Sequence, residues 1–218
     1  YRNYIRLGKM DYLYDKVETY DHLKAVIQGK TWPDGLSDIQ HRMADIEHHM
    51  LHFLDNHDEQ RLASPEFAGT PEKGKPLMVV SATISTAPTM IYFGQEVGEA
   101  GNENAGFGTH SRTSIFDYIG VPNHQRWMNG GKFDGGQLSQ SEKDLRDFYK
   151  RLLNFSINSS ALMGNFQEIQ TANRNITPGY DIAIYSYVRW SDTQKLIVVT
   201  NFYSLASSNF ELRIPADI

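Results

Sequence analysis

Phe53-Leu54-Asp55-Asn56-His57-Asp58 is the stretch that decides the fold, because an apolar run ends there in consecutive polar side chains. The run extends from Met50 to Leu54, and a short apolar segment of this kind is consistent with a buried strand. An amide, an imidazole and a carboxylate follow at positions 56 to 58. Polar side chains just after a buried strand are typical of a functional site at one edge of a sheet.

The segments on either side of this stretch alternate between predicted strands and predicted helices. Met10 to Tyr14 is a candidate strand, and Gly29 stops a helical stripe formed by Leu23, Val26 and Ile27. A Ser37–Gln40 capping box predicts the start of a second helix, whose apolar residues recur at helical spacing: Ile39, Met43, Ile46 and Met50.

The same alternation continues after the polar stretch. Pro76 suits the first turn of a buried helix that extends through Ala87 and ends at Pro88. Met90 to Phe93 is then a short buried strand with Gly94-Gln95-Glu96 as its polar exit. Strands and helices in this order, with polar residues at the strand ends, predict an α/β barrel or a doubly wound sheet.

A different pattern begins after a long glycine-rich loop from Glu99 to about Gly136. A Ser139–Glu142 capping box opens an amphipathic helix carrying Leu145, Phe148, Tyr149, Leu152 and Leu153. Beyond Gly164 the chain is rich in β-formers, in three predicted strands: 181 to 190, 195 to 202, and an alternating Phe210, Leu212 and Ile214. We therefore expect two domains, residues 1–163 and a small antiparallel β domain over 164–218.

Composition excludes several classes of function. The chain has 218 residues, 21 basic and 26 acidic side chains, a net charge of −5 and no cysteine. Disulfides and cysteine-based metal or redox sites are therefore excluded. The mixed charge argues against a nucleic-acid surface. No apolar run approaches the roughly 20 residues that cross a bilayer, so no membrane partner is expected. The opening Tyr1-Arg2-Asn3 suggests an internal piece of a longer parent protein.

Four segments together resemble the α-amylase superfamily, glycoside hydrolase family 13. Residues 53–58 match its Phe-x-x-Asn-His-Asp motif at the end of the seventh barrel strand. Residues 91–98 are similar to its eighth strand and exit, residues 11–16 to its sixth strand, and Arg126-Trp127-Met128 to a segment before its last helix. The bare tripeptide Asn-His-Asp is weak, but this context extends over essentially the whole chain. The resemblance implies a partial (β/α)8 TIM barrel, strands six to eight with their helices, followed by a β domain.

The resemblance also implies a function for the parent, a retaining hydrolase of starch-like α-glucans. Asp58 would be the catalytic carboxylate that stabilises the transition state, and His57 would bind the same sugar. The nucleophilic Asp and the acid Glu would precede residue 1, so we expect the chain alone to be inactive. No cofactor is expected in this chain, and ligands of any calcium ion in the parent would lie outside it. The resemblance and the lack of cysteine favour an extracellular or periplasmic parent, and open sheet edges predict self-association.

Two other functions stay open, a transglycosylase or debranching enzyme of the same superfamily and a non-catalytic glucan-binding or structural module. Four further residues are candidate sugar ligands: Asn56, Arg61, Gln95 and Glu96. Each also has a structural alternative. Asn56 would shape the turn, Arg61 would form a salt bridge, and Gln95 and Glu96 would pack beneath the site. Asp55 is expected to make a structural bond. Aromatic rings that could stack on sugars are Tyr92, Phe107 and Trp127.

A metal site is the weaker interpretation of the histidine-rich segment. His48 and His52 are four residues apart, a spacing that would bring them to one face of a helix beside Glu47 and His49. The apolar run has begun by His52, however, and a strand would separate the two rings. We therefore expect a polar helix end here and no metal.

Overall fold

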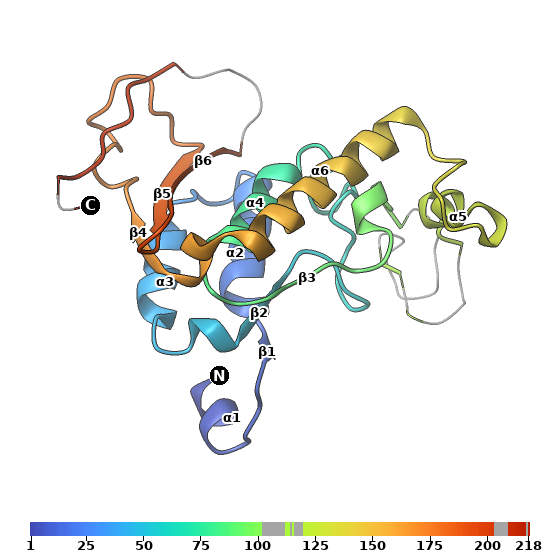
Figure 1. The fold of residues 1–218 in the computed structure, drawn as a ribbon, viewed down its shortest axis with the longest axis horizontal. Coiled ribbons are helices and arrows are strands. Elements are labelled where there is room, and N and C mark those ends of the chain that lie inside the picture. The colour runs from blue at the N-terminus through green and yellow to red at the C-terminus, as the bar shows by residue number, and fades with distance from the viewer. Residues whose placement is uncertain (102–111, 114, 116–119, 203–208, 217) are drawn as a thin grey trace.

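The computed structural model describes residues 1–101, 112–113, 115, 120–202, 209–216 and 218. Two three-stranded sheets organise these residues (Figure 1). The strands are β1 (Leu13–Tyr14), β2 (Met50–Phe53), β3 (Thr89–Met90), β4 (Asn165–Glu168), β5 (Ile184–Trp190) and β6 (Lys195–Asn201). The α-helices are α1 (Arg2–Arg6), α2 (Asp21–Ile27), α3 (Gly35–Met43), α4 (Lys75–Thr83), α5 (Pro122–Met128) and α6 (Gln140–Asn158). Shorter 3-10 or π-helical turns are η1 (Lys16–Tyr20), η2 (Glu47–His49), η3 (Gln95–Val97), η4 (Asn129–Gly131) and η5 (Ser160–Met163).

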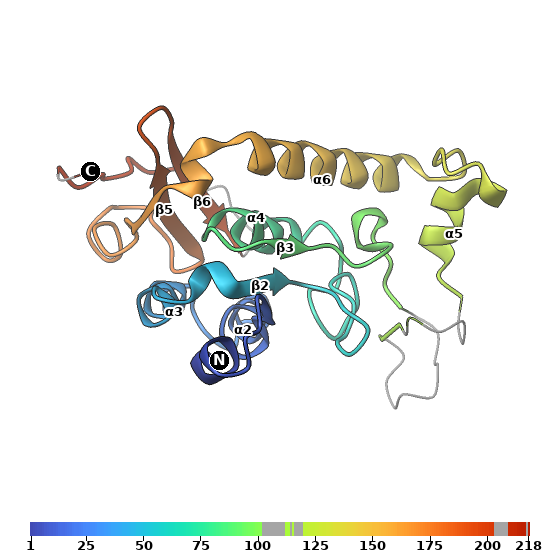
Figure 2. The ribbon, with the colours of Figure 1, turned by 60° about the horizontal axis from the view of Figure 1, so that its bottom comes forward.

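The first sheet is parallel in the order β1-β2-β3, with Leu13 opposite Met50. Helices α2 and α3 connect β1 to β2, and α4 connects β2 to β3, so each crossover contains a helix. In Figure 2, α4 and α6 lie above the parallel strands, and α2 and α3 lie below them. The strand predicted at 10–14 is present but shorter, whereas the one predicted at 90–93 is displaced and shares only Met90 with β3. The α/β class is thus confirmed, and the three parallel strands are consistent with part of a barrel.

The capping box predicted for α3 is wrong, whereas the one for α6 is correct. Helix α3 begins at Gly35, before Ser37, and Asp34 at its N-cap makes no side-chain capping bond. The Ser37 hydroxyl instead forms a hydrogen bond of 3.1 Å with the Tyr185 hydroxyl of β5. In α6, Ser139 Oγ accepts the amide of Glu142, whose carboxylate accepts the Ser139 amide. Of the two predicted capping boxes, a distant partner therefore overrides the one in α3.

Helix α4 begins at Lys75 with Pro76 in its first turn, as predicted, but it ends at Thr83 instead of Ala87. The Glu47 carboxylate explains the early end, because it accepts both the amide (2.9 Å) and the hydroxyl of Thr86. An amide bonded to a side chain no longer donates to the helix carbonyl four residues earlier. The chain therefore leaves the helix and turns into β3.

The second sheet is antiparallel in the order β4-β5-β6. Strands β5 and β6 were predicted, whereas β4 was not. The strand predicted over Phe210, Leu212 and Ile214 is wrong, since the described residues 209–216 contain no strand. Their backbone bonds to a side chain instead, because Asn173 accepts the Arg213 amide and donates to the Arg213 carbonyl, both at 2.8 Å. An amide side chain thus replaces a neighbouring strand.

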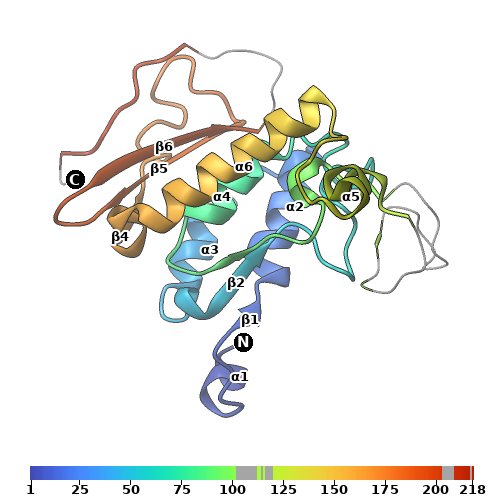
Figure 3. The same ribbon diagram turned by 45° about the vertical axis from the view of Figure 1, so that its right-hand side comes forward.

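One apolar core connects the two sheets. It joins Leu77 of α4 and Tyr149 of α6 to Tyr187 of β5. In Figure 3, α6 and α4 extend towards β5 and β6, while α1 lies at the far end near the N-terminus. The division into 1–163 and 164–218 stays a prediction, and the shared core couples its two parts. None of the helices in the described ranges is both long and apolar enough to cross a bilayer.

Candidate functional site

The polar stretch lies directly after β2, the central strand of the parallel sheet, at its carboxyl end. Its first member, Asp55, is fully buried. Asp55 accepts the amide of Leu62 and pairs with Arg61 Nη1 at 3.2 Å. Burial raises the pKa of Asp55 to about 6, and the opposing Arg61 charge does not cancel that rise. The predicted structural bond of Asp55 is therefore present, and it closes the loop that follows β2.

Arg61 connects the end of β2 to the end of β3, and with Asp55 it forms a buried platform under the loop that follows β2. Its side chain is fully buried, and its Nη1 also donates to the Phe93 carbonyl at 2.7 Å. Its Nε donates to Thr113 Oγ1 at 2.6 Å, and its guanidinium lies 4.5 Å from the centre of the Tyr92 ring. These contacts support the structural interpretation of Arg61, in which it positions the loop and does not touch substrate. The Tyr92 ring packs against the Arg61 guanidinium and so belongs to this platform.

Asn56 shapes the turn that presents the next two residues. Its side-chain oxygen accepts the backbone amides of Asp58 and Glu59, both at 2.8 Å, and the residue is buried. An asparagine that binds the backbone two residues ahead forms a tight turn without help from other segments. These contacts favour the turn-shaping interpretation of Asn56 over direct contact with a ligand.

His57 and Asp58 are the exposed members of the stretch, with side chains 42% and 67% exposed. Their Nε2 and Oδ2 atoms lie 3.3 Å apart, and Arg112 Nη2 lies 4.0 Å from Asp58 Oδ1. The Asp58 carboxylate accepts hydrogen bonds only, whereas an imidazole both donates and accepts. The pair can therefore hold neighbouring hydroxyl groups of one ligand above a rigid, buried base.

Gln95 and Glu96 lie in η3 after β3, and they face α6 instead of His57 and Asp58. Gln95 is buried, donates to the Tyr149 hydroxyl at 3.2 Å and accepts the Tyr92 amide. Glu96 lines a hollow of about 460 Å³ against α6, and Asp58 is not part of its lining. The structure thus places both residues towards α6, in keeping with packing beneath the site. Within the described part of the chain, no hydrogen bond or ion pair joins either residue to His57 or Asp58.

The sequence interpretation missed the pairing of Asp15 with His52, both of which are buried beneath the sheet end. His52 Nε2 lies 3.5 Å from Asp15 Oδ2, and His52 Nδ1 donates to the Ser81 carbonyl at 3.0 Å. Asp15 follows β1 as Asp55 follows β2, so a carboxylate directly after a predicted strand was the available signal. His52 belongs to β2, as the strand interpretation predicts. Across the described residues no three histidine, cysteine or acidic side chains could together hold a metal ion.

Of the aromatic candidates, Trp127 lies on α5, where its ring stacks on His124 at 5.6 Å between centroids. Helix α5 is attached through Glu99, whose Oε2 accepts the Asn123 amide at 2.9 Å. Phe107 lies outside the described residues. Trp127 also lies beneath Arg146 of α6, and within the described part of the chain no hydrogen bond, ion pair or ring contact joins it to the polar pair after β2.

Two solved structures share this fold. The gamma-CGTase of the alkalophilic Bacillus clarkii matches with a TM-score of 0.62 at 14% identity, covering 94% of this chain and 26% of its own. AmyP, solved in complex with maltose, matches with a TM-score of 0.56 at 19% identity, covering 88% of this chain and 40% of its own. This chain thus spans well under half the length of either protein. No protein-family model and no curated protein sequence matches the chain.

Both neighbours are members of glycoside hydrolase family 13. Their likeness covers most of this chain, including the parallel strands and the antiparallel sheet that follows. At these identities the likeness concerns the fold alone. The resemblance predicted from the sequence is therefore confirmed at the level of the fold, because the chain has the fold of part of each of these two proteins.

Proposed function

We propose that this chain supplies one wall of the active site of an α-glucan-cleaving glycosidase. The single observation that carries the proposal is the exposed pair His57 and Asp58, held at the carboxyl end of β2 by the buried Asp55–Arg61 pair. In α/β barrels, catalytic groups lie on the loops at that edge of the sheet. The amylase-type fold of the neighbours, one of them solved with maltose, supports a glucan as ligand.

In the proposed mechanism Asp58 acts on the sugar at the point of cleavage. Glycosidic cleavage passes through a positively charged, oxocarbenium-like transition state with a distorted ring. A carboxylate that accepts hydrogen bonds from the ring hydroxyls stabilises this distorted ring more than the relaxed one. His57, 3.3 Å from Asp58, donates to a neighbouring hydroxyl of the same sugar. The buried platform keeps both groups in place, so little reorganisation is needed during the reaction.

The proton donor and the nucleophile are proposed to come from segments of the parent protein other than this chain. A retaining mechanism needs both carboxyl groups in addition to Asp58. The proposal therefore assigns this chain a binding and transition-state role and assigns bond cleavage to the assembled protein.

Transfer to another sugar is the second candidate, favoured by the likeness to a gamma-CGTase. A transglycosylase would use the same Asp58 and His57, with a sugar hydroxyl replacing water as the acceptor. The two activities differ in their products, because hydrolysis releases a reducing end for each bond broken and transfer releases none.

A reducing-sugar assay with maltoheptaose tests the proposal on this chain and on a form extended upstream. We expect hydrolysis only in the extended form, together with glucan binding by both. Chromatography of the products separates hydrolysis from transfer, since transfer yields longer or cyclic glucans. Glucan binding without bond cleavage in either form would contradict the enzymatic role and would instead support a binding module.

A further inference from the structure

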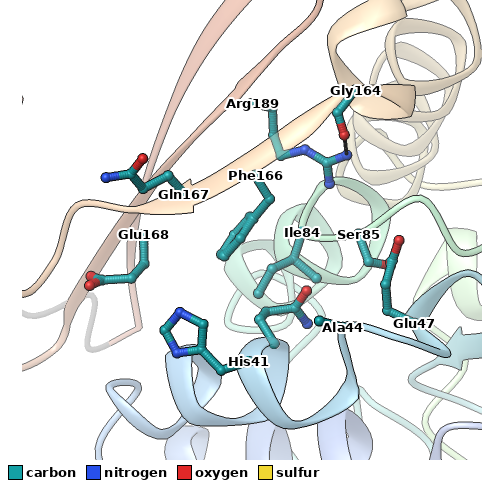
Figure 4. A pocket seen from close by; sticks show the side chains of 11 residues that line it. His41, Ala44, Glu47, Ile84, Ser85, Gly164, Phe166, Gln167, Glu168 and Arg189 are labelled. Atoms are coloured by element: carbon teal, nitrogen blue, oxygen red, sulfur yellow. Dashed lines mark hydrogen bonds between the residues drawn. The ribbon is translucent and has the colours of Figure 1, made fainter. Parts of the chain in front are cut away.

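The largest hollow described lies where the two sheets meet, away from His57 and Asp58. It has a volume of about 530 Å³ and is lined by α3, the segment after α4, and strands β4 and β5 (Figure 4). Small-molecule sites have volumes of about 300–1,000 Å³. This cavity is therefore large enough for a small organic ligand, and both structural parts of the chain contribute to its wall.

The cavity and Asp58 lie at opposite edges of the parallel sheet. Glu47, in the cavity wall, precedes β2, and Ser85 precedes β3, whereas Asp58 follows β2. Because the strands are parallel, their amino ends share one edge and their carboxyl ends share the other. A ligand in the cavity thus cannot be the sugar that Asp58 holds.

An aromatic ring forms the apolar part of the wall. Figure 4 shows the Phe166 side chain projecting from β4 into the cavity, between Arg189 on one side and His41 on the other. Its far side is anchored, since its ring centroid lies 5.6 Å from that of Tyr187. A fixed aromatic face suits the flat, C–H-rich face of a sugar ring, which is apolar although its rim is polar.

Two polar side chains of α3 with unused hydrogen-bonding groups line the same cavity. The side chains of Gln40 and His41 form no hydrogen bond within the described part of the chain, whereas the Gln167 side chain points away from Phe166 in Figure 4. Each side-chain amide offers two donor hydrogens and an acceptor oxygen, and the imidazole offers one donor and one acceptor. Gln40 is only 8% exposed, but the polar atoms of its amide remain accessible to solvent in the cavity. A ligand rich in hydroxyl groups satisfies donors and acceptors together.

The charges of the wall disfavour an anionic ligand. The Arg189 guanidinium has little capacity left to bind a ligand. It already donates to the backbone carbonyls of Thr83, Leu162, Asn165 and Gly164. These bonds use four of its five N–H groups. The other charged side chains of the wall are the carboxylates Glu47 and Glu168. A phosphate or carboxylate would therefore meet two negative charges and find one spare guanidinium hydrogen.

We propose that this cavity is a second saccharide-binding site, selective for a neutral pyranose ring stacked on Phe166. Gln40 and His41 hydrogen-bond its hydroxyl groups, and Glu168 accepts at the rim. The site is independent of Asp58 and requires no bond cleavage. It would attach a glucan to the junction of the two sheets while another part of the glucan lies at the opposite edge.

The test is a titration of the 218-residue chain with methyl α-D-glucoside, followed by the backbone amide signals in two-dimensional NMR. We expect saturable shifts at Ala44 and Gln167. Gln40→Ala and His41→Ala should each weaken this binding by about 3- to 10-fold, the effect of losing one hydrogen bond. The matched control Gln125→Ala, at an exposed position of α5 outside the cavity, should leave it unchanged.

Two further measurements address the ring and the charge. Phe166→Leu keeps an apolar side chain but removes the aromatic face, so it should weaken binding while the other amide signals keep their positions. D-glucuronate should bind more weakly than the neutral glucoside, because its carboxylate meets Glu47 and Glu168. Absence of saturable shifts at the cavity amides would overturn the proposal. Equal or tighter binding of glucuronate, or shifts confined to the loop of His57 and Asp58, would overturn it as well, the latter without touching the proposed function.

Discussion

Replacing Arg61 by methionine removes the buried cation that ties the end of β2 to the end of β3. The change deletes hydrogen bonds to Asp55, to the Phe93 carbonyl and to Thr113, at 3.2, 2.7 and 2.6 Å. It also leaves the fully buried Asp55 carboxylate without its counter-ion. Breaking a buried pair from one side costs about 3–5 kcal/mol. We therefore expect Arg61→Met to lower the free energy of unfolding by that amount at pH 7.

The structure also predicts how this loss depends on pH. Because the pKa of Asp55 is about 6, its carboxyl group is already mostly protonated at pH 5, and the ion pair is weakened before the mutation is made. The cost of Arg61→Met should then be smaller at pH 5 than at pH 7 by about 1 kcal/mol. Arg61→Lys, which keeps the charge but not the planar fork, should fall between the two proteins.

Urea unfolding at both pH values measures these differences, with an unchanged m-value as the check that only stability has changed. The double variant Asp55→Asn/Arg61→Met should be less damaged than the sum of the single variants, by about 0.5–3 kcal/mol, because both buried charges are gone. A loss below about 1 kcal/mol for Arg61→Met, or strict additivity in the double variant, would refute the platform role of this pair.

Three further changes test the buried Asp55, the cap of α6 and the close approach of the backbone at Gly164. Because the pKa of Asp55 is raised, its contribution to stability is complete below about pH 4 and is lost as the pH rises through about 6. Asp55→Asn should therefore flatten the dependence of the unfolding free energy on pH over this range. An unchanged slope would contradict the assignment of the raised pKa to Asp55. Ser139→Ala should cost about 1 kcal/mol by removing the cap of α6, and unchanged unfolding would show the cap to be dispensable. Gly164→Ala should cost about 1–3 kcal/mol, because its Cβ would lie 2.0 Å from the Trp190 carbonyl oxygen; retention of wild-type thermal stability would argue against that close approach.

Elements that depend on local signals were predictable from the sequence. Pro76 in the first turn of α4 and the reciprocal Ser139–Glu142 cap of α6 involve residues close in the chain. The order of the parallel strands followed from the alternation of apolar runs and helical stripes. The turn formed by Asn56 was also predictable, because its bonds reach only two and three residues ahead.

Features decided by distant partners were not predictable. Ser37 bonds to Tyr185, 148 residues away, and so does not cap α3. Similarly, Glu47 ends α4 by accepting the Thr86 amide from 39 residues away. The extended segment near Arg213 lacks a strand partner because the Asn173 side chain occupies its backbone groups. Patterns of apolar residues carry no information about such pairings.

In the candidate site, too, the residues given by a local motif were predictable, and the contacts made by distant partners were not. The motif itself located Asp58 and His57, since both follow a recognisable strand. The buried surroundings of Arg61 form only where the ends of two strands meet. The sequence alone therefore could not decide whether Arg61 binds the sugar or supports the loop. Asp15 was overlooked although it follows β1 as Asp55 follows β2. A carboxylate directly after each predicted parallel strand is therefore a signal worth weighing in similar chains.

The most direct test of the central claim is the rate of maltoheptaose hydrolysis by the upstream-extended protein with Asp58 or with Asp58→Asn. The substitution keeps the size of the side chain, removes its charge and replaces one acceptor oxygen by a donor NH2 group. We predict a fall in kcat of about 10²–10³, the usual effect of removing one transition-state-stabilising group, with a much smaller change in KM. An unchanged kcat would contradict the assignment of Asp58 as the carboxylate that stabilises the transition state.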